Sequence, residues 1–120
     1  MKEKSLISVK YLPDTAAAEQ LLREIGADER GVAIMKEKAV FRTVQVDEVP
    51  LRAAVILKET FLAKGAEAAV SRGVGALAVE SGSVLLMGTL KQYRQAIAEL
   101  KVQPFGLASL ARELEEELFG

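Results

Sequence analysis

The sequence contains no cysteine, histidine, tryptophan or asparagine, and aromatic residues make up only 5% of its 120 residues. Without cysteine it can form neither disulfides nor zinc–thiolate sites, and it has no thiol nucleophile. Without histidine it has no Ser–His triad and no side chain that ordinarily exchanges protons near neutral pH. A transition-metal site would need carboxylates alone, so we expect neither a metal nor a cofactor.

An excess of one charge is also missing. The sequence has 16 Lys and Arg residues and 17 Asp and Glu residues, which gives a net charge of −1, and the basic residues form no stripe. Non-specific binding to nucleic acid needs many cations on one face, so we expect no nucleic-acid partner. No apolar run reaches membrane-spanning length, and MKEKSLISVKYL is too polar for a signal peptide. We therefore expect no membrane association and a soluble, cytoplasmic protein.

Aliphatic residues are what the sequence does have. Half of its residues are hydrophobic, and few of these are aromatic. A chain of 120 residues is long enough to bury a core of Leu, Val, Ile and Ala without covalent staples. This length predicts one domain over residues 1–120.

The first half predicts alternating strands and helices. Alternation of Ile7, Val9 and Tyr11 with polar residues predicts a strand over residues 6–12. Pro13-Asp14-Thr15 predicts the start of a helix that ends at Gly26. A turn and a short helical piece follow in residues 27–35. The segment KAVFRTVQV then predicts a second strand.

The second half predicts short strands between helices. Pro50 suits the first turn of a helix that ends at Gly65. Strands are expected over residues 66–71, 76–80 and 83–87, with a tight turn at Ser81-Gly82. Thr89 and Gln92 form a capping-box pattern that opens a helix. After a break at residues 104–106, a last helix covers residues 107–118. The fold class is thus α+β: a two-layer sandwich with a mixed sheet of about four to five short strands, packed by three to four helices.

The glycine-rich stretch from residue 69 to residue 89 predicts a ligand site. The turn at Ser71, Arg72 and Gly73 offers backbone N–H groups and a guanidinium, and Gly88-Thr89 precedes a helix. If the two meet at one end of the sheet, they could share a phosphate. Neither matches a Walker loop or a dinucleotide fingerprint. The alternative is that the glycines only bend the chain and that Thr89 is only a cap.

The last helix carries an unusual charge distribution. Glu113 and residues 115–117, all glutamate, crowd its C-terminal end, where the helix dipole favours cations. The helix end either frays or leads, in a longer protein, into another domain. In the second case Leu114, Leu118 and Phe119 would form an interaction surface.

Several segments together resemble one known family. The sequences KAVFRTVQVDEV, ILKETFLAKGAEAAVSRG and SVLLMGTLKQYRQAIAELKVQPFGL occur in this order. They are similar to the N-terminal extension of dihydropteroate synthases from many clostridia-like bacteria. The shared pieces are the ILK helix start, GAEAAVSRG, VLLMGT with a following Lys-Gln pair, and QPFGL. The resemblance covers residues 31–118.

The resemblance implies a role near an enzyme. Dihydropteroate synthases condense a pterin diphosphate with p-aminobenzoate on a TIM barrel, whose first strand carries a motif with asparagine. This sequence has no asparagine and ends where the barrel would begin. No catalytic residue of the family can therefore be assigned here. The resemblance implies a stand-alone relative or an excised domain, and transferase activity only for a longer chain that includes the barrel.

Two functions follow as hypotheses. The first is a non-catalytic accessory domain in folate biosynthesis, whose partner is the synthase barrel or a second copy. The alternative is a small module that binds phosphate or a pterin ligand through the Arg72 turn and the Thr89 helix start.

Overall fold

A computed structural model describes residues 5–120 of the chain. The chain divides into two compact units, residues 1–40 and residues 41–120. One domain over residues 1–120 stays a prediction.

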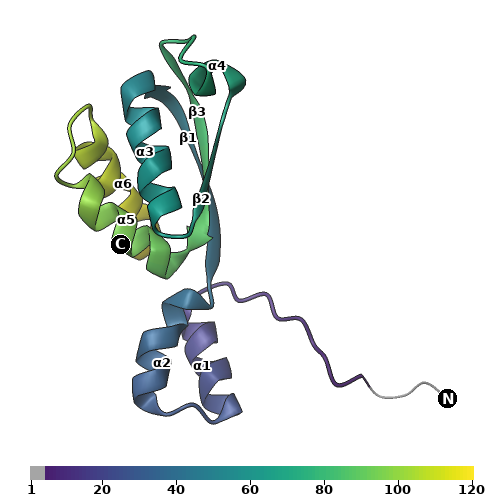
Figure 1. Cartoon of the computed structure of the whole chain (residues 1–120). Coiled ribbons are helices and arrows are strands. Elements are labelled where there is room, and N and C mark those ends of the chain that lie inside the picture. Colours follow the sequence, from purple (N-terminus) through teal and green to yellow (C-terminus); the bar gives the residue numbers. More distant parts are fainter. Residues whose placement is uncertain (1–4) are drawn as a thin grey trace. The chain divides into compact units, whose positions relative to one another are not determined.

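The first unit contains two helices and a short 3-10 turn (Figure 1). Helix α1 (Thr15–Ile25) begins as predicted, because the Asp14 carboxylate accepts a hydrogen bond from the Ala17 N–H at 2.8 Å. It also ends as predicted, at Gly26, whose φ of 98° suits a residue without Cβ. Helix α2 (Glu29–Met35) is the predicted short helical piece, and η1 (Lys36–Lys38) follows it.

The strand predicted over residues 6–12 is wrong. No strand forms there, and Ile7, Val9 and Tyr11 are 83%, 72% and 90% exposed. The alternating pattern is present, but a strand needs a neighbour to receive its backbone hydrogen bonds. In the part of the chain that the structure describes, no strand pairs with this segment.

The second unit is built on a three-stranded sheet. Its strands are β1 (Phe41–Pro50), β2 (Glu67–Val70) and β3 (Ser81–Thr89), in the order β1-β3-β2. Both pairings are antiparallel. The α+β class is confirmed. Within the described residues the sheet is antiparallel instead of mixed and has fewer strands than expected.

A β-bulge interrupts the β1–β3 ladder. The register runs without a break from Phe41 opposite Thr89 to Val46 opposite Val84, and then shifts before Val49. Glu48 in the bulge has a φ of 55°, in the left-handed region that non-glycine residues rarely occupy. The bulge therefore leaves six regularly paired residues at the start of β1.

The link between β2 and β3 also differs from the prediction. Residues 76–80 form no strand, because the chain turns back immediately after β2. The Ser71 hydroxyl caps the short helix α4 (Arg72–Gly75), and the Ala78 N–H donates to the Gly73 carbonyl at 2.8 Å. Ser81-Gly82 is not a turn but the start of β3. Local capping supplied hydrogen bonds that a strand would have needed from a neighbour.

Three helices cover one side of this sheet in Figure 1: α3 (Leu51–Ala63), α5 (Leu90–Leu100) and α6 (Leu107–Phe119). Pro50 precedes α3, and Thr89 with Gln92 opens α5 through the predicted capping box. No polar or charged residue in the described range is buried. The Phe61 and Tyr93 rings meet edge to face in the core, with centroids 5.3 Å apart. Among residues 5–120, no helix combines the length and the apolar character needed to cross a membrane.

Candidate interaction site

The two halves of the predicted anion site lie at opposite ends of the sheet. Ser71 follows Val70, which pairs with Val84, whereas Gly88 and Thr89 end the same strand, β3. At about 3.3 Å per residue, four or five residues of strand separate them by roughly 15 Å. Figure 1 shows α4 and the start of α5 at the two ends of the sheet. The structure therefore does not bring Arg72 and Thr89 to one phosphate.

The polar groups of each half have local partners instead. The Ser71 hydroxyl accepts from the Val74 N–H at 3.3 Å. The Thr89 hydroxyl accepts from the Gln92 N–H at 3.2 Å, and the Gln92 side chain accepts from the Thr89 N–H at 2.9 Å. A Cβ on Gly88 would lie 3.0 Å from the Ala66 Cβ. Capping and close packing thus account for these residues, and Arg72 is an exposed side chain beside them.

The C-terminal helix places its predicted surface residues unevenly. Leu114 is only 4% exposed and belongs to the core, so it cannot reach a partner without unfolding. Leu118 and Phe119 are partly buried against that core. The Arg94 guanidinium lies 4.0 Å from the centre of the Phe119 ring, a cation–π contact. Of the predicted surface, only Leu118 and Phe119 keep exposed area.

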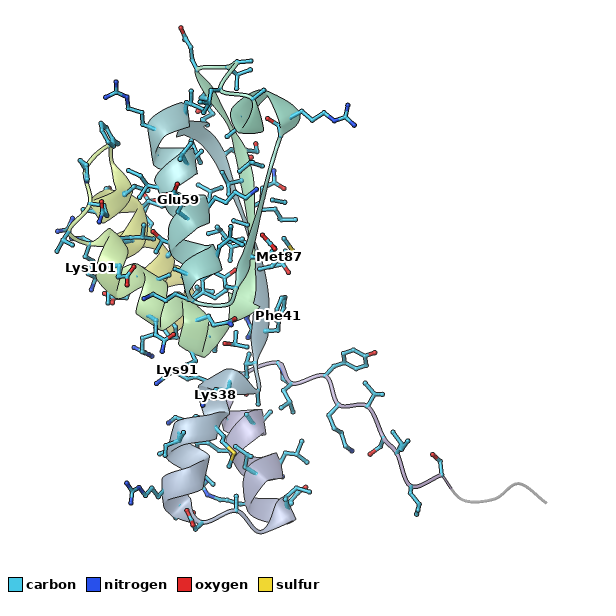
Figure 2. All side chains as sticks on the ribbon, viewed as in Figure 1. Lys38, Phe41, Glu59, Met87, Lys91 and Lys101 are labelled. Carbon is cyan, nitrogen blue, oxygen red and sulfur yellow. The ribbon has the colours of Figure 1, made fainter. Side chains whose placement is uncertain are left out.

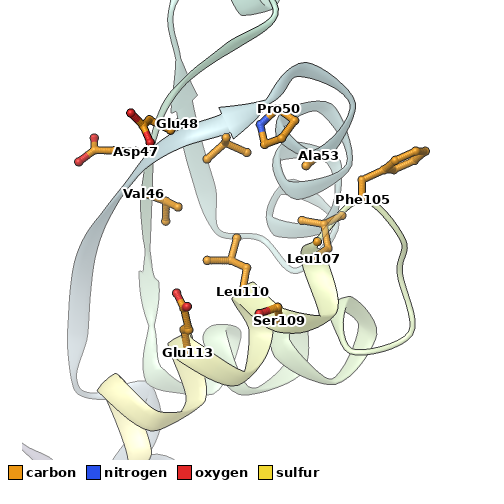
Figure 3. Close-up of a pocket in the computed structure, with 12 residues that line it drawn as sticks. Val46, Asp47, Glu48, Pro50, Ala53, Phe105, Leu107, Ser109, Leu110 and Glu113 are labelled. Carbon is orange, nitrogen blue, oxygen red and sulfur yellow. The ribbon is translucent and has the colours of Figure 1, made fainter.

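A groove runs between β1 and α6 and consists of two adjoining pockets of about 290 and 310 Å³, of which Figure 3 shows the first. Four residues line both pockets: Val46, Asp47, Leu110 and Glu113. The first pocket continues to Phe105 at the start of α6, and the second continues to Leu118 near its end. We call this feature the β1–α6 groove.

The groove is apolar inside and acidic at its edges. Its carboxylates come from Glu113 and Glu117 of α6, whereas the Asp47 and Glu48 side chains point away from Leu110 (Figure 3), and the described residues that line it include no Lys or Arg. Asp47 accepts hydrogen bonds from the Gln45 amide and the Ser83 hydroxyl, each at 2.8 Å. These bonds lower the pKa of Asp47 below its usual value, because they favour the charged form. Asp47 is thus held with Gln45 and Ser83 on the other face of the sheet, and the negative charge beside the apolar floor of the groove comes from Glu113 and Glu117.

The second exposed feature is the side of the sheet away from the helices. Figure 2 shows Phe41 and Met87 on this side. Phe41 is 58% exposed and Leu85 is 36% exposed, and Met87 is partly exposed between them. The register pairs Leu85 with Gln45 and with Ala69. We call Phe41, Leu85, Met87 and Ala69 the open sheet face.

The open sheet face was not predicted from the sequence, although a signal was present. In β3, Val84 and Leu86 are buried, and Leu85 and Met87 point to the other side. The uninterrupted apolar run VLLM is typical of a strand covered on both faces. Among the described residues, Leu85 and Met87 keep exposed area on one of those faces.

The amino-acid sequence is similar to parts of two bifunctional proteins whose names include dihydropteroate synthase. The chain is 29% identical to the bifunctional dihydropteroate synthase/dihydropteroate reductase of Helicobacter pylori, over 94% of its own length and 29% of that protein. It is 35% identical to the probable bifunctional folylpolyglutamate synthase/dihydropteroate synthase of Halobacterium salinarum, over 73% of its own length and 11% of that protein. The chain thus spans less than a third of either relative. No family model and no solved structure matches it.

Proposed function

We propose that this chain is a non-catalytic accessory domain that associates with the dihydropteroate synthase barrel, like the N-terminal extension of the clostridial-type enzymes. The names of the two relatives carry the proposal. Dihydropteroate synthase is joined to a reductase in one and to folylpolyglutamate synthase in the other. The synthase is what the two names share, and this chain matches a minor part of each relative.

The open sheet face is the surface that we assign to this association. Leu85 and Met87 lie two residues apart on one side of β3, and Phe41 of β1 lies diagonally across from Met87 on that side. Contiguous exposed apolar side chains of this kind are typical of protein interfaces. The relatives support the barrel as the occupant, because in both of them the matched region is part of a chain named for that enzyme.

Calorimetric titration of the full chain with the dihydropteroate synthase barrel of the same organism tests the association. A double variant, Phe41→Thr with Leu85→Thr, removes apolar area and keeps residues that favour strands. Its affinity for the barrel should fall by about tenfold or more, because burial of two large side chains is lost. Val102→Thr is the matched control, since Val102 is 82% exposed outside the open sheet face. Absence of binding, or equal loss in the control, would contradict the proposal.

The non-catalytic part of the proposal needs an activity measurement. Formation of dihydropteroate from a pterin diphosphate and p-aminobenzoate is followed with the chain alone, the barrel alone and the mixture. We expect product only where the barrel is present. Turnover by the chain alone would overturn this part and leave the association to be judged by the titration.

A further inference from the structure

Residues 6–11 carry the pattern of a strand but belong to none. Ile7, Val9 and Tyr11 alternate with Ser8 and Lys10, and the three apolar side chains are almost fully exposed. The Ile7 N–H and carbonyl bond to the exposed Ser5 hydroxyl, a local contact that pairing with a strand would replace, and the segment has one apolar side. A free sheet edge would satisfy both the backbone groups and the apolar side.

Strand β1 offers such an edge. It pairs with β3 on one side and is the outermost strand of the described sheet on the other. Its ladder with β3 is regular from Phe41 to Val46, before the bulge, and this stretch is six residues long. Residues 6–11 are also six residues, about 20 Å when extended. The two segments match in length.

The β1–α6 groove lies next to this stretch and is suited to the apolar side of an added strand. Val44 and Val46 of β1 line it together with Leu110 and Leu118 of α6. Leu110 and Leu118 are only partly buried by their own chain. Additional apolar side chains would complete their cover.

Charge complementarity favours the same pairing. Glu113 and Glu117 place two carboxylates on the α6 side of the groove, and its described lining residues include no cation. The first 12 residues of the sequence contain Lys2, Lys4 and Lys10 and one acidic residue, Glu3. Opposite net charges steer such surfaces together and disfavour pairing of the groove with acidic segments.

We infer that residues 6–11 of a second copy of this chain add as a strand to the free edge of β1. Their Ile7, Val9 and Tyr11 side chains then cover Leu110 and Leu118 in the β1–α6 groove. Each copy both gives a segment and receives one, so the exchange closes as a two-fold dimer. This inference does not rest on the proposed function, because it concerns the chain without any other protein.

Sedimentation equilibrium of the full chain over a wide concentration range tests the inference. The chain should show a monomer–dimer equilibrium. Val9→Gln should raise the dissociation constant of the dimer by about tenfold, since it removes a buried aliphatic side chain. Ser8→Gln is the matched control, because it puts the same side chain on the other side of the segment and should change the constant less than about threefold. Both sites are exposed and outside every helix and strand, so both variants should fold.

Amide hydrogen exchange identifies the surface used. Amides between Phe41 and Val46 should become more protected as the dimer forms, and Val9→Gln should reverse this protection. A chain that stays monomeric at every concentration would overturn the inference. So would a dimer that Leu85→Thr disrupts and Val9→Gln leaves intact, because such a dimer would use the open sheet face.

Discussion

Tyr93 shows how one residue connects the helical layer to the sheet. Its ring lies in the core against Phe61, and its hydroxyl donates to the Arg42 carbonyl at 2.9 Å. Burial raises the pKa of Tyr93 to about 12, because the phenolate would lose its hydration. The neutral phenol is therefore the form that the fold holds.

This raised pKa predicts the alkaline behaviour of the protein. Between pH 10 and pH 12 the unfolded chain releases the Tyr93 proton and the folded chain keeps it, so the free energy of unfolding should fall, by up to about 2 kcal/mol. Tyr93→Phe should reduce this alkaline loss and should cost about 1 kcal/mol at neutral pH, through the lost hydrogen bond. Urea unfolding at several pH values measures both effects. Tyr11→Phe is the control, and an unchanged alkaline slope in Tyr93→Phe would contradict the assignment.

Thr89 distinguishes two interpretations of the glycine-rich stretch: that it caps a helix, or that it binds phosphate. Its hydroxyl and the Gln92 side chain satisfy two N–H groups at the start of α5. Thr89→Ala should therefore lower the free energy of unfolding by about 1 kcal/mol in the absence of any ligand. Thr43→Ala, at an exposed position of β1, is the control for loss of a threonine in the sheet region.

The complementary measurement concerns phosphate. Inorganic phosphate should raise the melting temperature of the wild type and of Arg72→Ala to the same extent. A stabilisation that requires both Arg72 and Thr89 would contradict the separation of these residues along β3.

At the scale of elements, α6 is a part of the second unit's core. Leu107, Ala111 and Leu114 are buried, and Lys101 of the α5–α6 turn forms an ion pair with Glu115 at 2.8 Å. Leu114→Ala should lower the free energy of unfolding by about 2–5 kcal/mol, as for other buried leucines. Glu116→Ala, on the exposed side, should change it by less than about 0.5 kcal/mol. Equal, small effects of the two substitutions in urea unfolding would show that the helix frays.

Whether a helix or strand could be predicted from the sequence depends on whether the residues that determine it are close in the chain. Helix starts and ends were predictable, because Asp14, Gly26 and the Thr89–Gln92 pair act through neighbours within a few residues. The failures involve strands. Residues 6–12 alternate as a strand would, but no strand of the described sheet pairs with them. Residues 76–80 form no strand because the chain before them folds into the short helix that Ser71 caps. Pairing depends on residues far away in the chain, so a pattern of period two does not decide it.

At the scale of the whole molecule, the sequence predicted the α+β class and the similarity to proteins that contain dihydropteroate synthase, whereas the candidate site stays a prediction. Both relatives carry that enzyme in their names. The anion site failed as a joint site because an antiparallel register put Ser71 and Thr89 at opposite ends of β3. The open sheet face was missed because exposure of Leu85 depends on which layers cover the sheet, and the apolar run alone cannot show that.

Methyl NMR tests most directly the proposed binding of the synthase barrel to the open sheet face. Met87 lies on that face, and Met35 lies in α2 of the first unit. Selective labelling of the methionine methyl groups reports both sites in one spectrum as the barrel is added. We predict that the Met87 signal shifts or broadens in proportion to bound barrel and that the Met35 signal stays in place. A Met87 signal that is unchanged at saturation would contradict the account.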